Sequence, residues 1–262
     1  MNRGIYPILS GALVQEQRLQ VTANNLANVN TTGFKRDEPL FRSVMSRVSP
    51  VLPLSAQADA VVQPVFNSGR RGAERIFAAP QSLDTIFEAG RLRATGNPYD
   101  MAIQGPGFFE VKTPQGLRYT RNGVFHLDAK RRLVDETGLP VMGTMGGKKK
   151  AVELKIPEGN LTIAPNGTIH VNGDEVGAVR VVEFGDRNKP IKAGDGLYTG
   201  QNPKPAKDTQ LLQGHIEESA VNTITEMVKM IQVMRAYETA SKMIQTLDRT
   251  AETAIQDLGR VA

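Results

Sequence analysis

The feature that most constrains the fold is a long C-terminal segment, residues 221–258, that contains neither glycine nor proline. Its apolar residues recur at spacings of three and four, which is the periodicity of one face of an α-helix. The segment therefore predicts a long helix with the apolar stripe Val221, Ile224, Val228, Ile231, Met234, Tyr237, Ala240, Ile244, Leu247, Ala251, Ala254 and Leu258. Between Met227 and Tyr237 apolar residues cover most of the circumference, which predicts burial on more than one side.

The N-terminal segment carries a shorter version of the same pattern. Once Glu16 is counted in the series, apolar residues alternate at spacings of four and three, as in a heptad repeat: Ile5, Leu9, Ala12, Leu19, Ala23 and Leu26. Pro7 limits where this helix can start, because proline is tolerated only in a first turn. Asn28, Asn30 and Gly33 can each adopt the left-handed conformation that ends a helix.

Neither end of the chain is stable as a helix by itself. The N-terminal helix offers about six to eight apolar side chains, each worth roughly 1.5–3 kcal/mol when fully buried. Ordering its roughly 25 residues costs about 1–2 kcal/mol per residue in backbone entropy. Because one C-terminal helix covers only one face of it, the two helices must also pack on the central domain or on other copies of the chain.

The middle of the chain has the pattern of an antiparallel β structure. Short apolar strands alternate there with turn signals, of which Asn122-Gly123 is the strongest short hairpin signal and Pro165-Asn166-Gly167 is another. The predicted class is therefore α+β, with paired, coiled-coil-like terminal helices and a central β-rich domain. The expected divisions are an N-terminal helix in 1–35, an extended linker with short strands in 36–97, the β domain in 98–200, a return linker in 201–214 and the C-terminal helix in 215–262.

The residues needed for enzyme chemistry are missing or scattered. The absence of cysteine excludes disulfides and cysteine-based zinc sites. The three histidines lie far apart in the sequence, and no glycine-rich phosphate loop is present. No catalytic, cofactor-binding or metal site is predicted. Apolar runs fall far short of the roughly 20 residues that span a bilayer, and the N-terminus lacks the pattern of a cleaved signal peptide.

Two other classes of protein fit parts of the composition. The net charge of +5 and the run Lys148–Lys150 favour a basic nucleic-acid-binding protein, although aromatic residues do not alternate with the basic ones. The methionine-rich stretch 227–234 favours a helical adaptor or chaperone, because methionine suits adaptable binding surfaces. Limited proteolysis separates the adaptor from a polymer subunit, whose isolated chain would have protease-sensitive ends.

Three blocks resemble the axial proteins of the bacterial flagellum, the family of rod and hook subunits. "ANNLANVNTTGFK" (23–35) resembles the N-terminal signature of that family, and "YDMAIQGPGFFEV" and "RYTRNGVFHLD" resemble its central block. Residues 214–248 are similar to its C-terminal signature, which includes Glu217, Ser219 and Arg235. The length and the opening residues resemble a basal-body rod subunit, most closely the proximal rod type, with the distal rod as the alternative.

The resemblance implies an architecture and a set of partners. The terminal helices would pair and line the inner tube of a helical polymer, the hollow drive shaft, while the β domain faces outward. The expected partners are copies of the chain, other rod proteins and, in transit, the flagellar export apparatus, with no cofactor and no nucleic acid. The expected location is the periplasmic rod of the basal body, reached without a cleaved signal peptide and without a membrane span.

The expected self-assembly residues lie on both terminal segments. Those of the N-terminal segment are Ile5, Leu9, Leu19, Asn24, Asn25, Leu26, Asn28, Gly33 and Phe34. Those of the C-terminal segment are Val221, Glu226, Met227, Met230, Ile231, Met234, Arg235, Tyr237, Ile244 and Leu247. Under the family resemblance, Asn24, Asn25 and Asn28 form hydrogen bonds between subunits; the alternative is that these amides cap their own helix.

Overall fold

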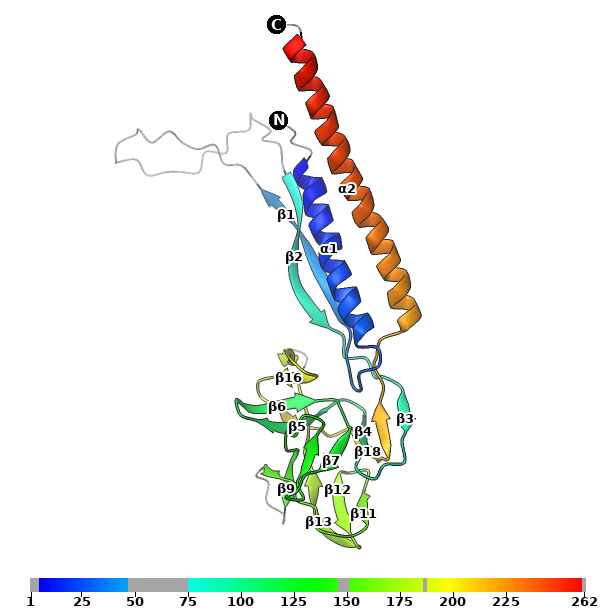
Figure 1. The fold of residues 1–262 in the computed structure, drawn as a ribbon. Coiled ribbons are helices and arrows are strands. Elements are labelled where there is room, and N and C mark those ends of the chain that lie inside the picture. The colour runs from blue at the N-terminus through cyan, green and yellow to red at the C-terminus, as the bar shows by residue number, and fades with distance from the viewer. Residues whose placement is uncertain (1–4, 47–74, 146–150, 186–187, 261–262) are drawn as a thin grey trace, which may run out of the picture. The chain divides into compact units, whose positions relative to one another are not determined.

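The computed structural model describes residues 5–46, 75–145, 151–185 and 188–260. Helix α1 (Ile5–Ala27) opens the chain, helix α2 (Thr223–Arg260) closes it, and strands occupy much of the chain between them (Figure 1). The predicted α+β class is confirmed, whereas the pairing of the two helices stays a prediction. The chain divides into a helix–ribbon unit (Met1–Thr22, Pro39–Asp84, Val228–Ala262) and a β unit (Ala23–Glu38, Thr85–Met227).

The strands are numbered in chain order. Their bounds are β1 Asp37–Ser46, β2 Arg75–Thr85, β3 Leu92–Ala94, β4 Met101–Gln104, β5 Phe108–Thr113, β6 Gly116–Thr120, β7 Phe125–Leu127, β8 Leu133–Asp135, β9 Met142–Met145, β10 Val152–Glu153, β11 Leu161–Ile163, β12 Thr168–Val171, β13 Asp174–Val179, β14 Val181–Glu183, β15 Ile191–Gly194, β16 Leu197–Thr199, β17 Lys204–Pro205, β18 Gln210–Gln213 and β19 His215–Glu217.

The helix–ribbon unit contains most of α1 and α2 together with a two-stranded sheet of β1 and β2. On α1, Ala12, Val14 and Val21 are buried. The Arg18 guanidinium lies 5.1 Å from the centre of the Phe41 ring, which places α1 against β1. Within the described residues, neither helix has the length and apolar character needed to cross a membrane.

The region expected as an extended linker contains longer strands than its sequence indicated. β1 and β2 are ten and eleven residues long, although each contains a proline, Pro39 and Pro80 respectively. Both strands of a two-stranded sheet are edge strands, and a proline is tolerated where its missing N–H faces away from the partner. Because of these prolines, the sequence pattern indicated an extended linker with short strands where two long strands form.

The C-terminal end of the β region also differs from the expectation. The region expected as a return linker contains β17 and β18, and the first residues expected in the C-terminal helix form β19. α2 begins at Thr223, because Asn222 accepts a hydrogen bond from the Thr225 amide through its side chain (3.1 Å) and from the Glu226 amide through its carbonyl (3.0 Å). This arrangement is that of a helix N-cap.

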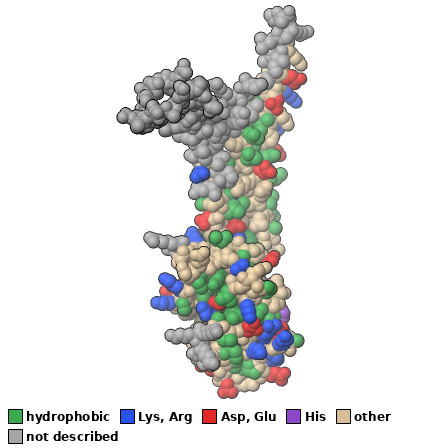
Figure 2. Space-filling model, turned by 90° about the vertical axis from the view of Figure 1, so that its left-hand side faces the viewer, with side chains coloured by type: hydrophobic (Ala, Val, Ile, Leu, Met, Phe, Trp, Pro, Cys, Tyr) green, Lys and Arg blue, Asp and Glu red, His purple; other side chains and the backbone are tan. Residues whose placement is uncertain are grey.

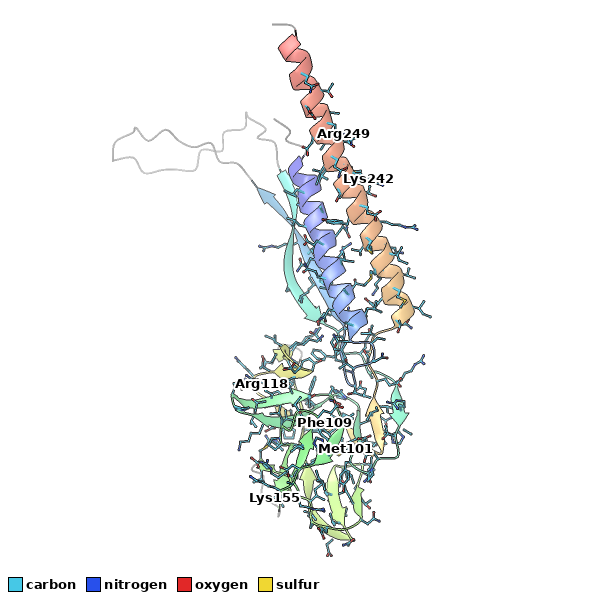
Figure 3. The ribbon with its side chains drawn as sticks, viewed as in Figure 1. Met101, Phe109, Arg118, Lys155, Lys242 and Arg249 are labelled. Carbon is cyan, nitrogen blue, oxygen red and sulfur yellow. The ribbon has the colours of Figure 1, made fainter. Side chains whose placement is uncertain are left out.

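The β unit is built from two larger antiparallel sheets and several two-stranded ones. The six-stranded sheet has the order β15-β16-β6-β5-β14-β17, and the five-stranded sheet has the order β10-β9-β13-β12-β11. Their main core includes Met101, Phe109, Val111 and Leu133, all completely buried (Met101 and Phe109 are labelled in Figure 3). A second, aromatic cluster joins Phe108, Tyr119 and Tyr198. These contacts make the β unit a domain with its own core.

One carboxyl group on β5 is buried in an unusual setting. Glu110 is almost completely buried, and its Oε2 lies 2.9 Å from Nε of the partly exposed Arg180. Neither carboxylate oxygen has a hydrogen bond of good geometry. Burial therefore raises the pKa of Glu110, although the charge of Arg180 partly lowers it.

We expect Glu110→Gln to change how stability depends on pH. Because the folded pKa of Glu110 lies above the unfolded one, its contribution to stability is fully present below about pH 4.3. That contribution is lost as the pH rises through the raised folded pKa. The free energy of unfolding of the wild type, relative to Glu110→Gln, should thus fall as the pH increases through this window. Urea titrations of both proteins at a series of pH values measure the difference, and parallel pH profiles would contradict the assignment.

Candidate functional site

The first turns of α2 expose apolar side chains to solvent. Ile224 is 75% exposed. Four further residues of this surface, here called the apolar face of α2, are about half exposed: Met227, Val228, Ile231 and Met234. At about 100° per residue, all five lie on one side of the helix. An exposed stripe of this kind on a structured helix is a candidate interface.

The same side of α2 becomes charged after Met234. Arg235, Glu238, Lys242, Arg249 and Glu252 follow one another at spacings of three, four or seven, and all are exposed. Lys242 and Arg249 are labelled on α2 in Figure 3. We call this surface the charged face of α2. Its mixture of positive and negative side chains is typical of a helix side that remains solvated.

A second apolar stripe lies on the opposite side of α2. Met230, Val233, Ala240, Ile244 and Leu247 follow spacings of three and four, and each is partly buried. Tyr237 belongs to the same stripe and is 40% exposed. Between Met227 and Tyr237 the helix is therefore apolar on two sides, and the predicted burial of both sides is not reached in the single chain, where Met227, Ile231 and Met234 are about half exposed.

The remaining predicted assembly residues differ in exposure. On the N-terminal segment, Leu9 and Asn24 are exposed, Leu19, Leu26, Asn28 and Phe34 are partly buried, and Asn25 and Gly33 are buried; the side chain of Ile5 lies outside the described residues. On the C-terminal segment, Val221 and Glu226 are buried and Arg235 is exposed. The structure therefore divides the predicted set into exposed, partly buried and buried residues.

Asn24, Asn25 and Asn28, three of the four asparagines of the N-terminal signature, have different roles within the chain. Asn25 is buried, donates from Nδ2 to the Asp37 carbonyl (2.9 Å) and accepts from the Asp37 amide through Oδ1 (3.0 Å). Asn28 donates to the Asn24 carbonyl (2.9 Å), which caps its own helix. The Asn24 side chain is exposed and can face a neighbouring subunit.

We expect Asn25→Ala and Asn24→Ala to affect stability very differently. Alanine at position 25 leaves the partly buried amide and carbonyl of Asp37 without these partners, at a cost of up to about 1–3 kcal/mol for each unsatisfied group. Alanine at position 24 should change the free energy of unfolding by at most about 0.5 kcal/mol, because the site is on the surface. Urea denaturation of the two variants measures both values. Equal stability of the two proteins would contradict this role for Asn25.

Three buried charged side chains from distant parts of the chain meet in the β unit. We call Lys35, Arg121 and Glu217 the Glu217 cluster. Lys35 Nζ lies 2.5 Å from Glu217 Oε1, and Arg121 Nη1 lies 3.3 Å from Glu217 Oε2. Lys35 and Glu217 are 1% and 2% exposed. One carboxylate thus forms ion pairs with two buried cations.

Backbone groups also bind these charged side chains, although Arg121 Nε is buried without a hydrogen-bond partner among the described residues. Lys35 also donates to the Glu88 carbonyl (2.6 Å), and the Gly90 amide donates to Glu217 Oε1 (2.8 Å). Arg121 donates to the carbonyls of Ile103 (3.1 Å) and Gly105 (2.6 Å). Burial lowers the pKa of Lys35, and the nearby Glu217 carboxylate opposes this shift.

A second polar group fixes the segment that carries Lys35. Lys192 Nζ donates to the Lys35 carbonyl (2.6 Å) and to Asp37 Oδ2 (2.8 Å). The same ammonium lies 4.0 Å from the centre of the Phe34 ring, a cation–π geometry. Burial also raises the pKa of the neighbouring Tyr198. These contacts fix the chain between α1 and β1.

The Glu217 cluster was not among the residues expected to be functional. Its members nevertheless lie one in each of the three blocks of family resemblance: Lys35 in the N-terminal block, Arg121 in the central block and Glu217 in the C-terminal block. The signal in the sequence that could have pointed to the Glu217 cluster is the presence of a charged residue in each of the three blocks. Their convergence requires knowledge of the fold, because Lys35 and Glu217 are 182 residues apart.

The described surface offers little for metal or nucleic-acid chemistry. Across residues 5–46, 75–145, 151–185 and 188–260, no group of three His, Asp or Glu side chains is placed to hold a metal ion. On the face shown in Figure 2, basic side chains lie beside acidic ones. Among the described residues, Arg132 pairs with both Asp128 (2.8 Å) and Glu153 (3.1 Å). The run Lys148–Lys150 lies outside the described residues.

Three family models match the chain in the order of the resembling blocks. The flagella basal body rod protein model matches residues 8–35. The flagellar hook protein FlgE/F/G D1 domain matches residues 102–171. The flagellar basal body rod FlgEFG protein C-terminal model matches residues 212–257.

Several flagellar proteins are similar over nearly the whole chain. The basal-body rod protein FlgF of Caulobacter vibrioides is 31% identical, with all of both chains covered. FlgF of Mesorhizobium japonicum is 28% identical, with 99% of each chain covered. The rod protein FlgG of Buchnera aphidicola subsp. Schizaphis graminum is 32% identical, with 94% of this chain and 96% of that protein covered.

These matches confirm the predicted family. The chain is a structural protein of the bacterial flagellum and not an enzyme. Because family models match the chain at both ends and in the middle, and because it is similar to known rod proteins over their full length, the chain belongs to the family of flagellar basal-body rod proteins.

Proposed function

We propose that the chain polymerises helically through its terminal helices and forms part of the hollow drive shaft of the flagellum. α1 and α2 pair in a coiled-coil manner in the assembled state, and neighbouring copies cover the apolar surfaces that one chain leaves exposed. Contacts of this head-to-tail kind generate a helical filament when they do not close into a ring.

The observation that carries this proposal is the apolar face of α2. Ile224, Met227 and Ile231 are exposed on it in the single chain, and the opposite stripe also consists of apolar residues. Burying a fully exposed apolar side chain contributes roughly 1.5–3 kcal/mol, and each half-exposed residue of this face can gain about half of that. Because the helix is apolar on two sides near Ile231, it needs two packing partners at that level. The charged face of α2 then remains in contact with water.

We assign the chain to the proximal part of the rod, with the distal rod as the alternative. Support comes from the FlgF proteins, which are similar over their full length, while similarity to FlgG keeps the alternative open. The chain reaches the periplasmic rod through the flagellar export apparatus without a cleaved signal peptide. Its lasting partners are copies of itself and other rod proteins.

Imaging of basal bodies tests this function. Cells that lack the chain should yield basal bodies whose rod is incomplete at its proximal end, and expression of the chain should restore the rod and swimming. A tag on the exposed turn at Gly138 should appear on the outer surface of the proximal rod. Intact rods in cells without the chain would rule out the proposal, and labelling at the distal rod would select the alternative.

A further inference from the structure

Two short segments from opposite ends of the chain occupy the β unit together. The N-terminal segment is Thr32–Asp37, and the C-terminal strap is Gln210–Glu217, which contains β18 and β19. Each makes contacts of its own with the β unit, and each also contacts the other. The question is whether the two segments dock independently.

The strap completes two strand pairs that have no other partner among the described residues. β18 pairs with β4 from Gln210–Gln104 to Gln213–Met101, and β19 pairs with β3. Leu211 and Ile216 are buried. The Gln213 side chain accepts from the Ile163 amide (3.0 Å) and donates to the Leu161 carbonyl (3.0 Å). The strap is thus an integral part of the β unit.

The N-terminal segment depends on the strap for three contacts. The Gly33 amide donates to the Glu217 carbonyl (2.8 Å), and the Phe34 carbonyl accepts from the Ala220 amide (3.0 Å), just beyond the strap. The third contact is the buried pair of Lys35 and Glu217. Docking Lys35 without this carboxylate would bury an ammonium without a counter-charge, which is strongly unfavourable.

The dependence also holds in the other direction. Glu217 is buried with Lys35 and Arg121 as its cations. If the N-terminal segment were absent, Glu217 would lose its shorter ion pair and the partner of its backbone carbonyl. Each segment therefore creates the binding site of the other, as expected for groups in one shared network.

We propose that the N-terminal segment and the strap dock as a single cooperative unit. Lys35 and Glu217 are 182 residues apart, so the N-terminal segment can dock with its counter-charge only when the C-terminal strap is present. The end of α1, which Asn25 ties to Asp37, is then fixed only after the strap has docked. The inference concerns folding and does not depend on the position of the chain in the rod.

Hydrogen exchange on the full-length Gly33→Ala variant tests this coupling. A Cβ at Gly33 would lie 2.4 Å from the carbonyl carbon of Arg121, and the backbone has φ +67°, so the segment cannot dock unchanged. The amides of Gly214 and Glu218 donate to the carbonyls of Asp100 and Arg91 in the β unit. In the variant, both amides should exchange faster than in the wild type, and by the same factor as the Ala220 amide. The matched control is Gly138→Ala, with φ +82° and open space around the glycine, which should leave all three at the wild-type rate.

The amide of Lys112 serves as a reference in the sheet, since it donates to the Pro140 carbonyl. Faster exchange of Ala220 alone, with Gly214 and Glu218 at the wild-type rate, would overturn the proposal. If Gly33→Ala also speeds up exchange of the Lys112 amide, the variant has disturbed the whole sheet, and the milder variant Ile216→Val is used instead to test the coupling. That variant should accelerate Gly33 and Glu218 equally, by roughly 2- to 12-fold from the usual cost of Ile→Val. An unchanged rate at Gly33 would show that the two segments dock separately.

Discussion

Replacement of Glu217 by alanine is expected to lower the free energy of unfolding of the β unit by about 3–5 kcal/mol, the usual cost of removing one partner of a buried ion pair. The reason is that Lys35 and Arg121 stay buried without their carboxylate. For a domain of this size the melting temperature should fall by roughly 6–20 °C. Differential scanning calorimetry of the full-length protein measures the change.

Two controls distinguish the effect of leaving buried cations without a counter-charge from the effect of removing any glutamate. Glu175→Ala removes a carboxylate at an exposed position of β13 and should change stability by less than about 0.5 kcal/mol. In the Glu217→Ala background, Lys35→Met removes one of the two uncompensated charges and should restore part of the lost stability. A double variant as unstable as the sum of the two single variants would contradict this account of the cluster.

The pH dependence of the same proteins provides an independent check. Burial holds the pKa of Lys35 below its usual value, so between the folded and the unfolded pKa the folded chain binds fewer protons. Stability therefore rises with pH across that window. Loss of the Glu217 charge removes an effect that raises this pKa, so the window should begin at a lower pH in Glu217→Ala. Lys35→Met should lack this rise.

Replacement of Ile231 by aspartate is expected to prevent polymerisation while leaving the single chain folded. Ile231 is 53% exposed, so the single chain loses little when it changes. Because about half of the side chain is already covered in the single chain, an interface between copies gains roughly 0.8–1.5 kcal/mol from burying the rest, and losing this gain alone raises the critical concentration about 4- to 13-fold. Burying the new carboxylate adds a further cost.

Sedimentation of the assembled polymer and swimming of complemented cells measure this effect. The matched control is Gln245→Asp, which introduces the same charge on the same helix at an exposed position among the residues of the charged face of α2. It should assemble and swim like the wild type. Normal assembly of Ile231→Asp would show that the apolar face of α2 is not an interface, whereas failure of both variants would point to a general intolerance of α2 to negative charge.

Local patterns in the sequence were sufficient for the two helices and the β character of the middle. The absence of glycine and proline over residues 221–258 and the spacings of three and four predicted α2, because helical contacts join residues three and four apart. The three blocks of resemblance identified the family. Pro165-Asn166-Gly167 joins the paired strands β11 and β12, as predicted, because turn conformation depends on neighbouring residues. The hairpin expected at Asn122-Gly123 is wrong: the turn lies between β6 and β7, but β6 pairs with β5 and β16 and β7 pairs with β8, because tertiary packing selects the strand partners.

Only the tertiary structure could decide the contacts between distant segments. Strands β1 and β2 pair although Pro39 and Pro80 interrupt their patterns, and β19 replaces the expected start of the helix. Asn25, expected between subunits, bonds to Asp37 within its own chain. Lys35 and Glu217 appear as ordinary surface charges in the sequence, because nothing near either one encodes a partner 182 residues away. Burial of such a pair depends on how the sheets close around it, and that is a property of the whole fold.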